Sequence, residues 1–221
     1  MLNQKALRYE DFTVGQLVEG TVDSVLSSGI TVDLGVNLRG FIPKLHWADD
    51  PRLKKPELRF KPGTTVSCRV LKYNSDRKSL MLTCKKSLVT DSRPIYHESN
   101  QLAKKTSVKG TVSLIEKGGI LVSLYGELAG WIPFARLEKR GLTSQHFFLG
   151  QLVDCVVESI DSNTGKVVLD LEKGDTAAAD TARGLGEIVQ CKVEKVNTEG
   201  SHLGLEVYQL LFDSIYVYLL C

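Results

Sequence analysis

Four ring-bearing side chains lie beside glycine, proline or basic residues, where they could contact a ligand. Phe41 stands in the segment GFIP and Trp131 in the segment GWIP, while His46 and Trp47 follow GFIP in a basic stretch. Aromatic rings can stack on unpaired bases while nearby cations contact phosphates, and stacking is worth roughly 1–3 kcal/mol per base. Each ring is therefore a candidate for contact with a nucleic acid. Packing inside a folded domain is the open alternative for each ring.

No residues in the sequence are spaced for catalysis or for metal binding. The four histidines have no cysteine or carboxylate at ligand or triad spacing, and the chain has no GxxxxGK segment. The pair Asp49 and Asp50 is more typical of a turn than of a metal site. We therefore expect a protein that is not an enzyme and that needs no cofactor and no metal.

The five cysteines show no CxxC spacing. Cys68 and Cys155 each lie in an alternating apolar run, which predicts small buried thiols. The other cysteines complete no disulfide framework, which indicates a reducing compartment. The polar N-terminal residues lack an apolar core, so we expect no secretory signal there.

The elements that must position the candidate residues are duplicated. The segment from Gly20 to Pro43 recurs from Gly110 to Pro133 at a constant offset of ninety residues. Downstream, the segment from Gly63 recurs from Gly150 at an offset of eighty-seven. A unit of about ninety residues has the size of a small independent domain rather than of a solenoid repeat.

Each unit has the pattern of a small β-barrel. In the first unit, alternating apolar runs separated by turn residues predict strands over 17–26, 30–34, 39–43, 65–73 and 78–84. A longer connection separates the third strand from the fourth, as in a Greek-key barrel of the OB type. The expected fold is therefore all-β, with tandem five-stranded antiparallel OB-fold barrels and an incomplete third repeat.

The same patterns predict the domain boundaries. We expect a lead-in over 1–12, a first barrel over 13–87, a linker over 88–105 and a second barrel over 106–173. A further linker over 174–185 precedes a partial third repeat over 186–207. Residues 208–221 are apolar, but too few to span a bilayer comfortably, so they are either a foreign or truncated tail or a native strand pair.

Charge is unevenly distributed along the chain. Residues 1–90 hold 15 Lys and Arg against 9 Asp and Glu, whereas residues 91–221 hold 13 against 17. A basic half favours a polyanionic partner, and a solvated surface of mixed charge is the alternative.

A glycine-led first strand, a strand of glycine, aromatic residue, Ile and Pro, and a closing KSLMLT hairpin together resemble the S-one RNA-binding domain, named for ribosomal protein S-one. The resemblance covers most of residues 13–173. It implies OB-fold barrels that bind single-stranded or looped RNA. GFIPKLH and the run of consecutive repeats are similar to nucleolar ribosome-assembly proteins. This implies nuclear and nucleolar localisation, a role in rRNA processing and subunit biogenesis, pre-ribosomal RNA and other ribosome-assembly proteins as partners, and no membrane.

The ligand face of this family carries two aromatics around the glycine of the second strand, a histidine, an aspartate in the turn between the fourth and fifth strands, and a cation that opens the fifth. The present sequence departs from it, with polar, glycine or leucine residues at the aromatic positions and proline for histidine (Ser28, Thr31, Gly118, Leu121, Pro43 and Pro133). By strand alternation Phe41 and Trp131 lie on the same side as those prolines and can supply substitute rings. The residues expected to contact RNA are Arg39, Phe41, Lys44, His46, Trp47, Lys72, Asn74, Arg77, Lys78, Trp131, Arg136, Asp161 and Lys166.

A different class of function is also consistent with these residues. Loss of the usual aromatic face and the net-acidic second half favour a protein-interaction scaffold in a pre-ribosomal particle, with little direct RNA contact. The two hypotheses differ in the salt dependence of RNA binding, which is steep only for an RNA-binding module.

Overall fold

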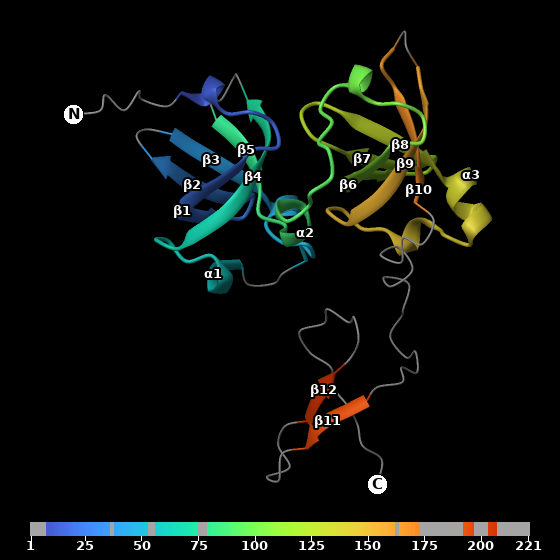
Figure 1. The fold of residues 1–221 in the computed structure, drawn as a ribbon. Helices are drawn as coiled ribbons and strands as arrows, with labels where there is room; N and C mark the ends of the chain where they lie inside the picture. Colours follow the sequence, from blue (N-terminus) through green and yellow to red (C-terminus); the bar gives the residue numbers. More distant parts are fainter. Residues whose placement is uncertain are drawn as a thin grey trace. The chain divides into compact units, whose positions relative to one another are not determined.

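The computed structural model describes residues 8–35, 38–52, 56–74, 79–161, 164–172, 192–196 and 203–206. These residues form two closed five-stranded barrels and one two-stranded sheet (Figure 1). The chain divides into two compact units, Met1–Ala182 and Arg183–Cys221, and the first of these holds both barrels. The prediction of an all-β chain with two OB-type barrels is confirmed.

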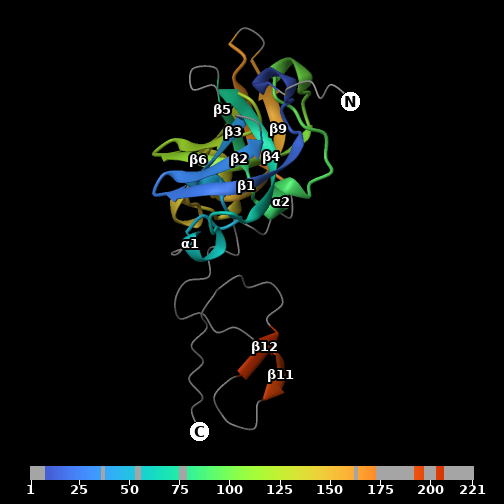
Figure 2. The same cartoon turned by 90° about the vertical axis from the view of Figure 1, so that its left-hand side faces the viewer.

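The first barrel is built from β1 (Leu17–Leu26), β2 (Gly29–Gly35), β3 (Leu38–Pro43), β4 (Thr65–Asn74) and β5 (Ser79–Thr83), in the spatial order β1-β2-β3-β5-β4. In Figure 2 this barrel faces the viewer. Four of its pairings are antiparallel, but β3 and β5 pair in parallel, with Gly40 opposite Leu80. The expectation of a wholly antiparallel barrel is therefore wrong at this pair. The other four pairings make β1, β3 and β5 run in one direction and β2 and β4 in the other. The β4–β5 hairpin brings β5 beside β3, so this pair is parallel.

The second barrel repeats this arrangement. Its strands are β6 (Ser107–Glu116), β7 (Gly119–Ser123), β8 (Ala129–Pro133), β9 (Leu152–Ile160) and β10 (Val167–Leu171), and β8 pairs with β10 in parallel. The register is also repeated, because Gly29 is opposite Pro43 and Gly119 is opposite Pro133.

Short helices occupy the connections. The first barrel has η1 (Tyr9–Asp11) before β1, η2 (Lys44–His46) and α1 (Pro56–Arg59) between β3 and β4, and α2 (Lys86–Val89) after β5. In the second barrel η3 (Ser99–Gln101) precedes β6, and α3 (Phe134–Leu137), η4 (Glu138–Arg140) and η5 (Ser144–His146) lie between β8 and β9.

The inward side chains of each barrel form one apolar core. Ile30, Ile42 and Leu82 are fully buried in the first barrel, as are Ile120 and Ile132 in the second. Tyr9 and Phe12 of the lead-in pack against the first core. Cys68 and Cys155 are both 0% exposed, as predicted, and neither forms a disulfide. Burial raises the pKa of the Cys68 thiol to about 12, so this thiol stays protonated and acts as a small packing residue.

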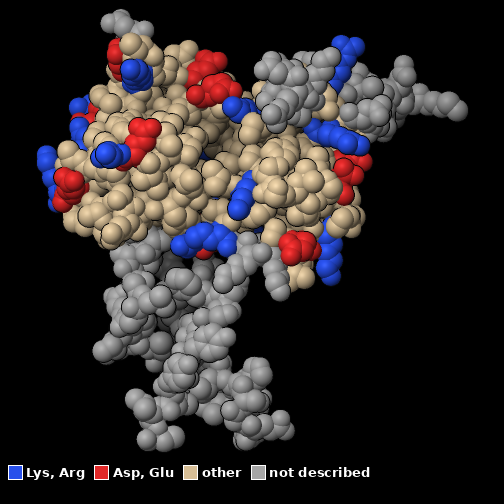
Figure 3. Space-filling view, turned by 180° about the vertical axis from the view of Figure 1, so that it is seen from behind, with Lys and Arg blue, Asp and Glu red and all other residues tan. Residues whose placement is uncertain are grey.

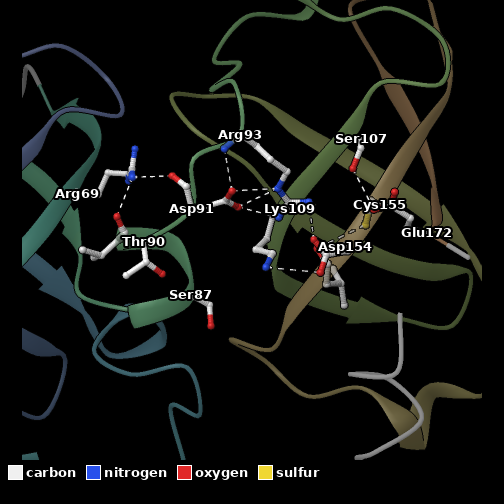
Figure 4. Close-up of polar contacts among 12 residues, drawn as sticks. Arg69, Ser87, Thr90, Asp91, Arg93, Ser107, Lys109, Asp154, Cys155 and Glu172 are labelled. Atoms are coloured by element: carbon white, nitrogen blue, oxygen red, sulfur yellow. Dashed lines mark hydrogen bonds and ion pairs between the residues drawn. The ribbon is translucent and has the colours of Figure 1, made fainter. Parts of the chain in front are cut away.

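The segment that connects the barrels is anchored by polar contacts to both of them (Figure 4). The guanidinium of Arg69, on β4, donates to the carbonyls of Gly15 and Asp91 at 3.1 and 2.9 Å. Arg93 pairs with the carboxylates of Asp91 and Asp154, each at 2.7 Å. Burial would raise the pKa of Asp91, but the hydrogen bonds and charge of Arg93 outweigh it and hold the pKa below its usual value.

Lys85 links the two barrels directly. Its side chain is fully buried, and its ammonium donates to the carbonyls of Ala48 at 2.7 Å and Asp49 at 3.1 Å in the first barrel and of Gly150 at 2.7 Å in the second. Burial lowers the pKa of Lys85 to about 8, against the opposing effect of Asp49 and Asp50. The ammonium form, with three N–H groups, matches the three acceptors.

In the second unit, β11 (Lys192–Val196) pairs with β12 (Leu203–Glu206) in an antiparallel sheet. The linker expected over 174–185 and the tail expected over 208–221 lie outside the described residues. Among the residues that are described, no helix has the length and apolar character needed to cross a membrane.

Candidate nucleic-acid interface

On the first barrel, one row of outward side chains crosses four strands. Ser24 is opposite Thr31, Thr31 is opposite Phe41, and Phe41 is opposite Met81. All four residues are partly exposed, and the hydroxyls of Ser24 and Thr31 are hydrogen-bonded at 2.5 Å. Thr31 occupies one of the positions where the resembling family carries an aromatic side chain. The strand register therefore places the Phe41 ring beside that position, on the face predicted from strand alternation.

Glycine in the neighbouring strand makes room for this ring. A Cβ atom on Gly29 would lie 2.7 Å from Cζ of Phe41, and a Cβ atom on Gly119 would lie 2.8 Å from Cζ2 of Trp131. Real Cβ atoms essentially never lie this close to another heavy atom, so each ring lies against bare glycine backbone. Both rings are half-buried as a result, which fixes them in place and leaves part of each ring at the surface.

Two cations flank Phe41 in the sequence. Arg39 lies two residues earlier on β3, and its side chain is 70% exposed, with only a long contact of 4.0 Å to Asp23. Lys44 follows the end of β3, is exposed, and has its ammonium 5.9 Å from the centre of the Trp47 ring. Because both charged groups remain in contact with solvent, both can approach a phosphate without first breaking a strong ion pair.

The second barrel has no cation at either of the two equivalent positions. Ala129 stands where the first barrel has Arg39, and Phe134 where it has Lys44. Arg136 lies 3.8 Å from the carboxylate of Glu158 and 3.9 Å from that of Asp170. Trp131 thus keeps the place of Phe41, but the predicted cation Arg136 is paired with carboxylates.

One predicted contact residue, Trp47, is a packing residue instead, and a second, His46, carries no charge. Trp47 is only 3% exposed, and its indole N–H donates to the carbonyl of Pro51 at 3.1 Å, so it is not a stacking surface. Burial, and to a lesser extent the charge of Lys85, lowers the pKa of His46 to about 3. The imidazole is therefore neutral at physiological pH and supplies no positive charge. The expectation that this pair forms a second ligand surface is wrong for Trp47, because apolar burial outweighs its sequence position beside cations.

The remaining predicted residues are dispersed. The ammonium of Lys72 lies 2.9 Å from the Glu127 carboxylate of the second barrel. Asp161 orders the β9–β10 turn by accepting a hydrogen bond from the Thr164 hydroxyl at 2.6 Å, while Lys166 beyond it is exposed. Asn74 ends β4, and Arg77 and Lys78 lie outside the described residues.

The surface charges indicate that a nucleic-acid interface would be confined to a small area rather than spread over the surface. Seen from behind, basic and acidic side chains form small groups separated by uncharged surface (Figure 3). Ser24 and Met81 were not anticipated as neighbours of Phe41, because only the strand register brings them beside it. An alignment of the two repeats that included pairing register could have identified them.

Comparison with known proteins agrees with this fold. Residues 12–83 match the model of the RRP5 S1 domain, where S1 is the S-one type. The chain is 35% identical over 169 residues to the rRNA biogenesis protein rrp5 of Schizosaccharomyces pombe, covering 76% of this chain and 10% of that protein. It is 30% identical over 220 residues to the Protein RRP5 homolog of Mus musculus, covering 91% and 11%. Against the small ribosomal subunit protein bS1 of Rickettsia typhi the identity is 28%, covering 74% of this chain and 28% of that protein. The chain thus spans about a tenth of the length of these RRP5 relatives.

Proposed function

We propose, from the premise that this chain carries S1-type repeats resembling those of RRP5, that it is an RNA-binding module of a nucleolar ribosome-assembly factor. Its ligand is single-stranded or looped pre-ribosomal RNA, bound during rRNA processing and the biogenesis of both subunits. Other ribosome-assembly proteins are its further partners. The module acts by binding and positioning RNA rather than by catalysing a reaction.

One observation carries this proposal: the half-buried Phe41 ring lies on the outer face of the first barrel, with the exposed cations Arg39 two residues before it and Lys44 three residues after it in the chain. An unpaired base stacks on the exposed part of the ring, and Arg39 and Lys44 contact the phosphates on either side of it. The hydroxyls of Thr31 and Ser24, next to the ring, can donate to or accept from the edge of the base. Duplex RNA does not fit this arrangement, because its bases are already stacked.

The test is a titration of the full chain with a fluorescent single-stranded RNA pool at two salt concentrations. Reversing two charges, in Arg39→Glu with Lys44→Glu, is expected to weaken binding at low salt by at least about tenfold and to flatten the salt dependence by about two counterions. The matched control is Lys61→Glu with Lys86→Glu, which makes the same change in net charge at exposed residues outside β1–β3.

The control keeps the affinity within about threefold if the ligand binds where we propose. Equal losses in the two double variants would mean that RNA responds only to net charge, and no loss in either would exclude the first barrel as the RNA site. A chain that binds the pool weakly and without salt dependence would instead be a protein-interaction scaffold.

A further inference from the structure

The outer face of the second barrel carries an unbroken row of apolar side chains. Leu114 is opposite Leu121, Leu121 is opposite Trp131, and Trp131 is opposite Val168, so the row crosses β6, β7, β8 and β10. Leu114 is 42% exposed and the other three are half-buried. We refer to these four residues as the apolar row.

The apolar row stands where the first barrel has polar residues. By the repeat offset, Leu114 and Leu121 replace Ser24 and Thr31, whose hydroxyls are hydrogen-bonded to each other. Leucine cannot make hydrogen bonds to the edges of bases, and contiguous apolar side chains at a surface are typical of sites that another protein covers.

Charge around the apolar row also disfavours RNA. The positions of Arg39 and Lys44 are Ala129 and Phe134 here, and Asp170 holds both nearby arginines, with Arg140 at 3.2 Å. A polyanion gains its affinity from cations that are free to replace its counterions, and these arginines are already paired. The surface therefore suits a protein better than a phosphate backbone.

A groove adjoins the apolar row at the β6–β7 turn. It has a volume of about 860 Å³, and its lining includes Ile115, Glu116, Lys117, Gly118, Phe134 and Glu138. Gly118 connects it to the row, since a Cβ atom there would lie 3.6 Å from Cζ2 of Trp131. Glu116 and Glu138 are exposed and have no ion-pair partner among the residues that the structure describes. Lys117 is the one cation in the lining, so two carboxylates stand against one ammonium and this end of the surface is net acidic, which is complementary to a basic side chain.

We propose that the apolar row and its groove bind an amphipathic helix of a partner protein, with a lysine or arginine of that helix beside Glu116 and Glu138. Adjacent strands are about 4.8 Å apart, close to the helical pitch of about 5.4 Å, so side chains one turn apart on the helix meet successive strands. The four strands span about 15 Å, which corresponds to roughly ten residues of helix. This goes beyond the RNA proposal and uses different residues.

The probe is a displayed library of helices about 15 residues long, each with leucines at i, i+4, i+7 and i+11 and with either basic or acidic residues at one end. It is selected against the full chain. The diagnostic variant is Leu114→Ser with Leu121→Thr, which restores the polar pair of the first barrel at surface positions. Leu26→Ser is the control, because Leu26 is 50% exposed but lies outside the row.

We expect basic-ended helices to be enriched, and the diagnostic variant to bind them at least about tenfold more weakly while Leu26→Ser binds them unchanged. The proposal is overturned if no helix is enriched, or if the enriched helices bind both variants equally. It is also overturned if the diagnostic variant loses RNA affinity as Phe41→Ala does, because the row would then be an RNA face. Thermal unfolding of each variant establishes that it is folded. The Phe41→Ala variant is expected to keep helix binding even if the RNA proposal fails, so the two proposals are tested separately.

Discussion

The two barrels share a fold and differ in the chemistry of one face. Strand order, the parallel closing pair and the aromatic ring lying against glycine are the same in both. The outward row, however, reads Ser, Thr, Phe and Met in the first barrel and Leu, Leu, Trp and Val in the second. Inward positions determine whether the barrel closes. Outward positions on the same strands are free to change, and they determine what class of molecule the face can bind.

A second difference lies where each barrel ends. Lys85 and Glu172 are equivalent by the downstream repeat offset, but Lys85 is buried between the barrels whereas Glu172 is partly exposed and accepts a hydrogen bond from Ser107. In the first repeat this position therefore joins the two barrels, whereas in the second repeat it is an ordinary surface residue.

The largest expected effect is a difference in stability between variants of Lys85 and of its equivalent, Glu172. Replacing Lys85 by Met should lower the free energy of unfolding by about 2–4 kcal/mol, because the buried carbonyls of Ala48 and Gly150 lose their donor. Glu172→Gln should cost less than about 1 kcal/mol, since its partner remains accessible to water. Urea unfolding of the two variants measures both values. Equal costs would show that Lys85 does not hold the barrels together as described.

The next effect separates the two rings. Phe41→Ala is expected to weaken RNA binding by roughly 1–3 kcal/mol through lost stacking, whereas Trp131→Ala should change it by less than about 0.5 kcal/mol. Fluorescence anisotropy with a single-stranded RNA pool measures the two losses. Phe41→Leu serves as a control that keeps apolar packing against Gly29 but removes the aromatic ring. If Trp131→Ala is the more damaging change, the assignment of faces is reversed.

A pH-dependent effect distinguishes two further equivalent residues. His46 and Arg136 each stand third after the proline that ends the strand, but His46 is half-buried with its Nδ1 atom enclosed, and Arg136 is ion-paired at the surface. The pKa of His46 is lowered to about 3, so the unfolded chain binds its proton first as pH falls. Stability from this group is complete above about pH 6.5 and is lost progressively toward pH 3.

Between pH 7 and pH 5 this loss should amount to roughly 1–2 kcal/mol. His46→Gln should remove that part of the pH dependence, while Arg136→Gln should leave it. Urea unfolding at the two pH values gives the comparison. A wild-type slope that persists in His46→Gln would assign the acid sensitivity to other groups.

The smallest effect sharpens the comparison by making the second barrel more like the first. Ala129→Arg introduces a cation at the position of Arg39 and should raise RNA affinity about two- to fivefold, with one more counterion released. Ala129→Gln controls for side-chain size. A salt titration of both variants is the measurement, and an equal gain in the two would mean that charge at this position does not reach the RNA.

The sequence predicted the barrels because their evidence is local and repeated. Turn glycines, alternating runs and the offset of ninety residues recur in both units, and alternation alone placed Phe41 and Trp131 outward. The parallel closing pair was not predicted, because it depends on how distant segments meet rather than on any pattern within a strand. For the same reason the burial of Trp47 could not be read from its basic neighbours: its ring packs against strands far away in the chain.

The polar anchors of the connecting segment were missed entirely. Arg69, Asp91, Arg93 and Asp154 lie in three separate stretches of sequence, and each is an unremarkable charged residue in its own context. Only tertiary structure brings them together.

These anchors have a consequence for any ligand long enough to touch both barrels. A loosely tethered second domain must be found and oriented after the first has bound, which costs rotational and translational entropy. Here the contacts of Arg93 and Lys85 already hold the two barrels together in the folded chain, so much of that entropy is lost before the ligand binds. The second contact would therefore form at a higher effective concentration. The same restraint selects ligands by length. Only ligands whose two contact points match the fixed separation of the faces would bind with this higher effective concentration.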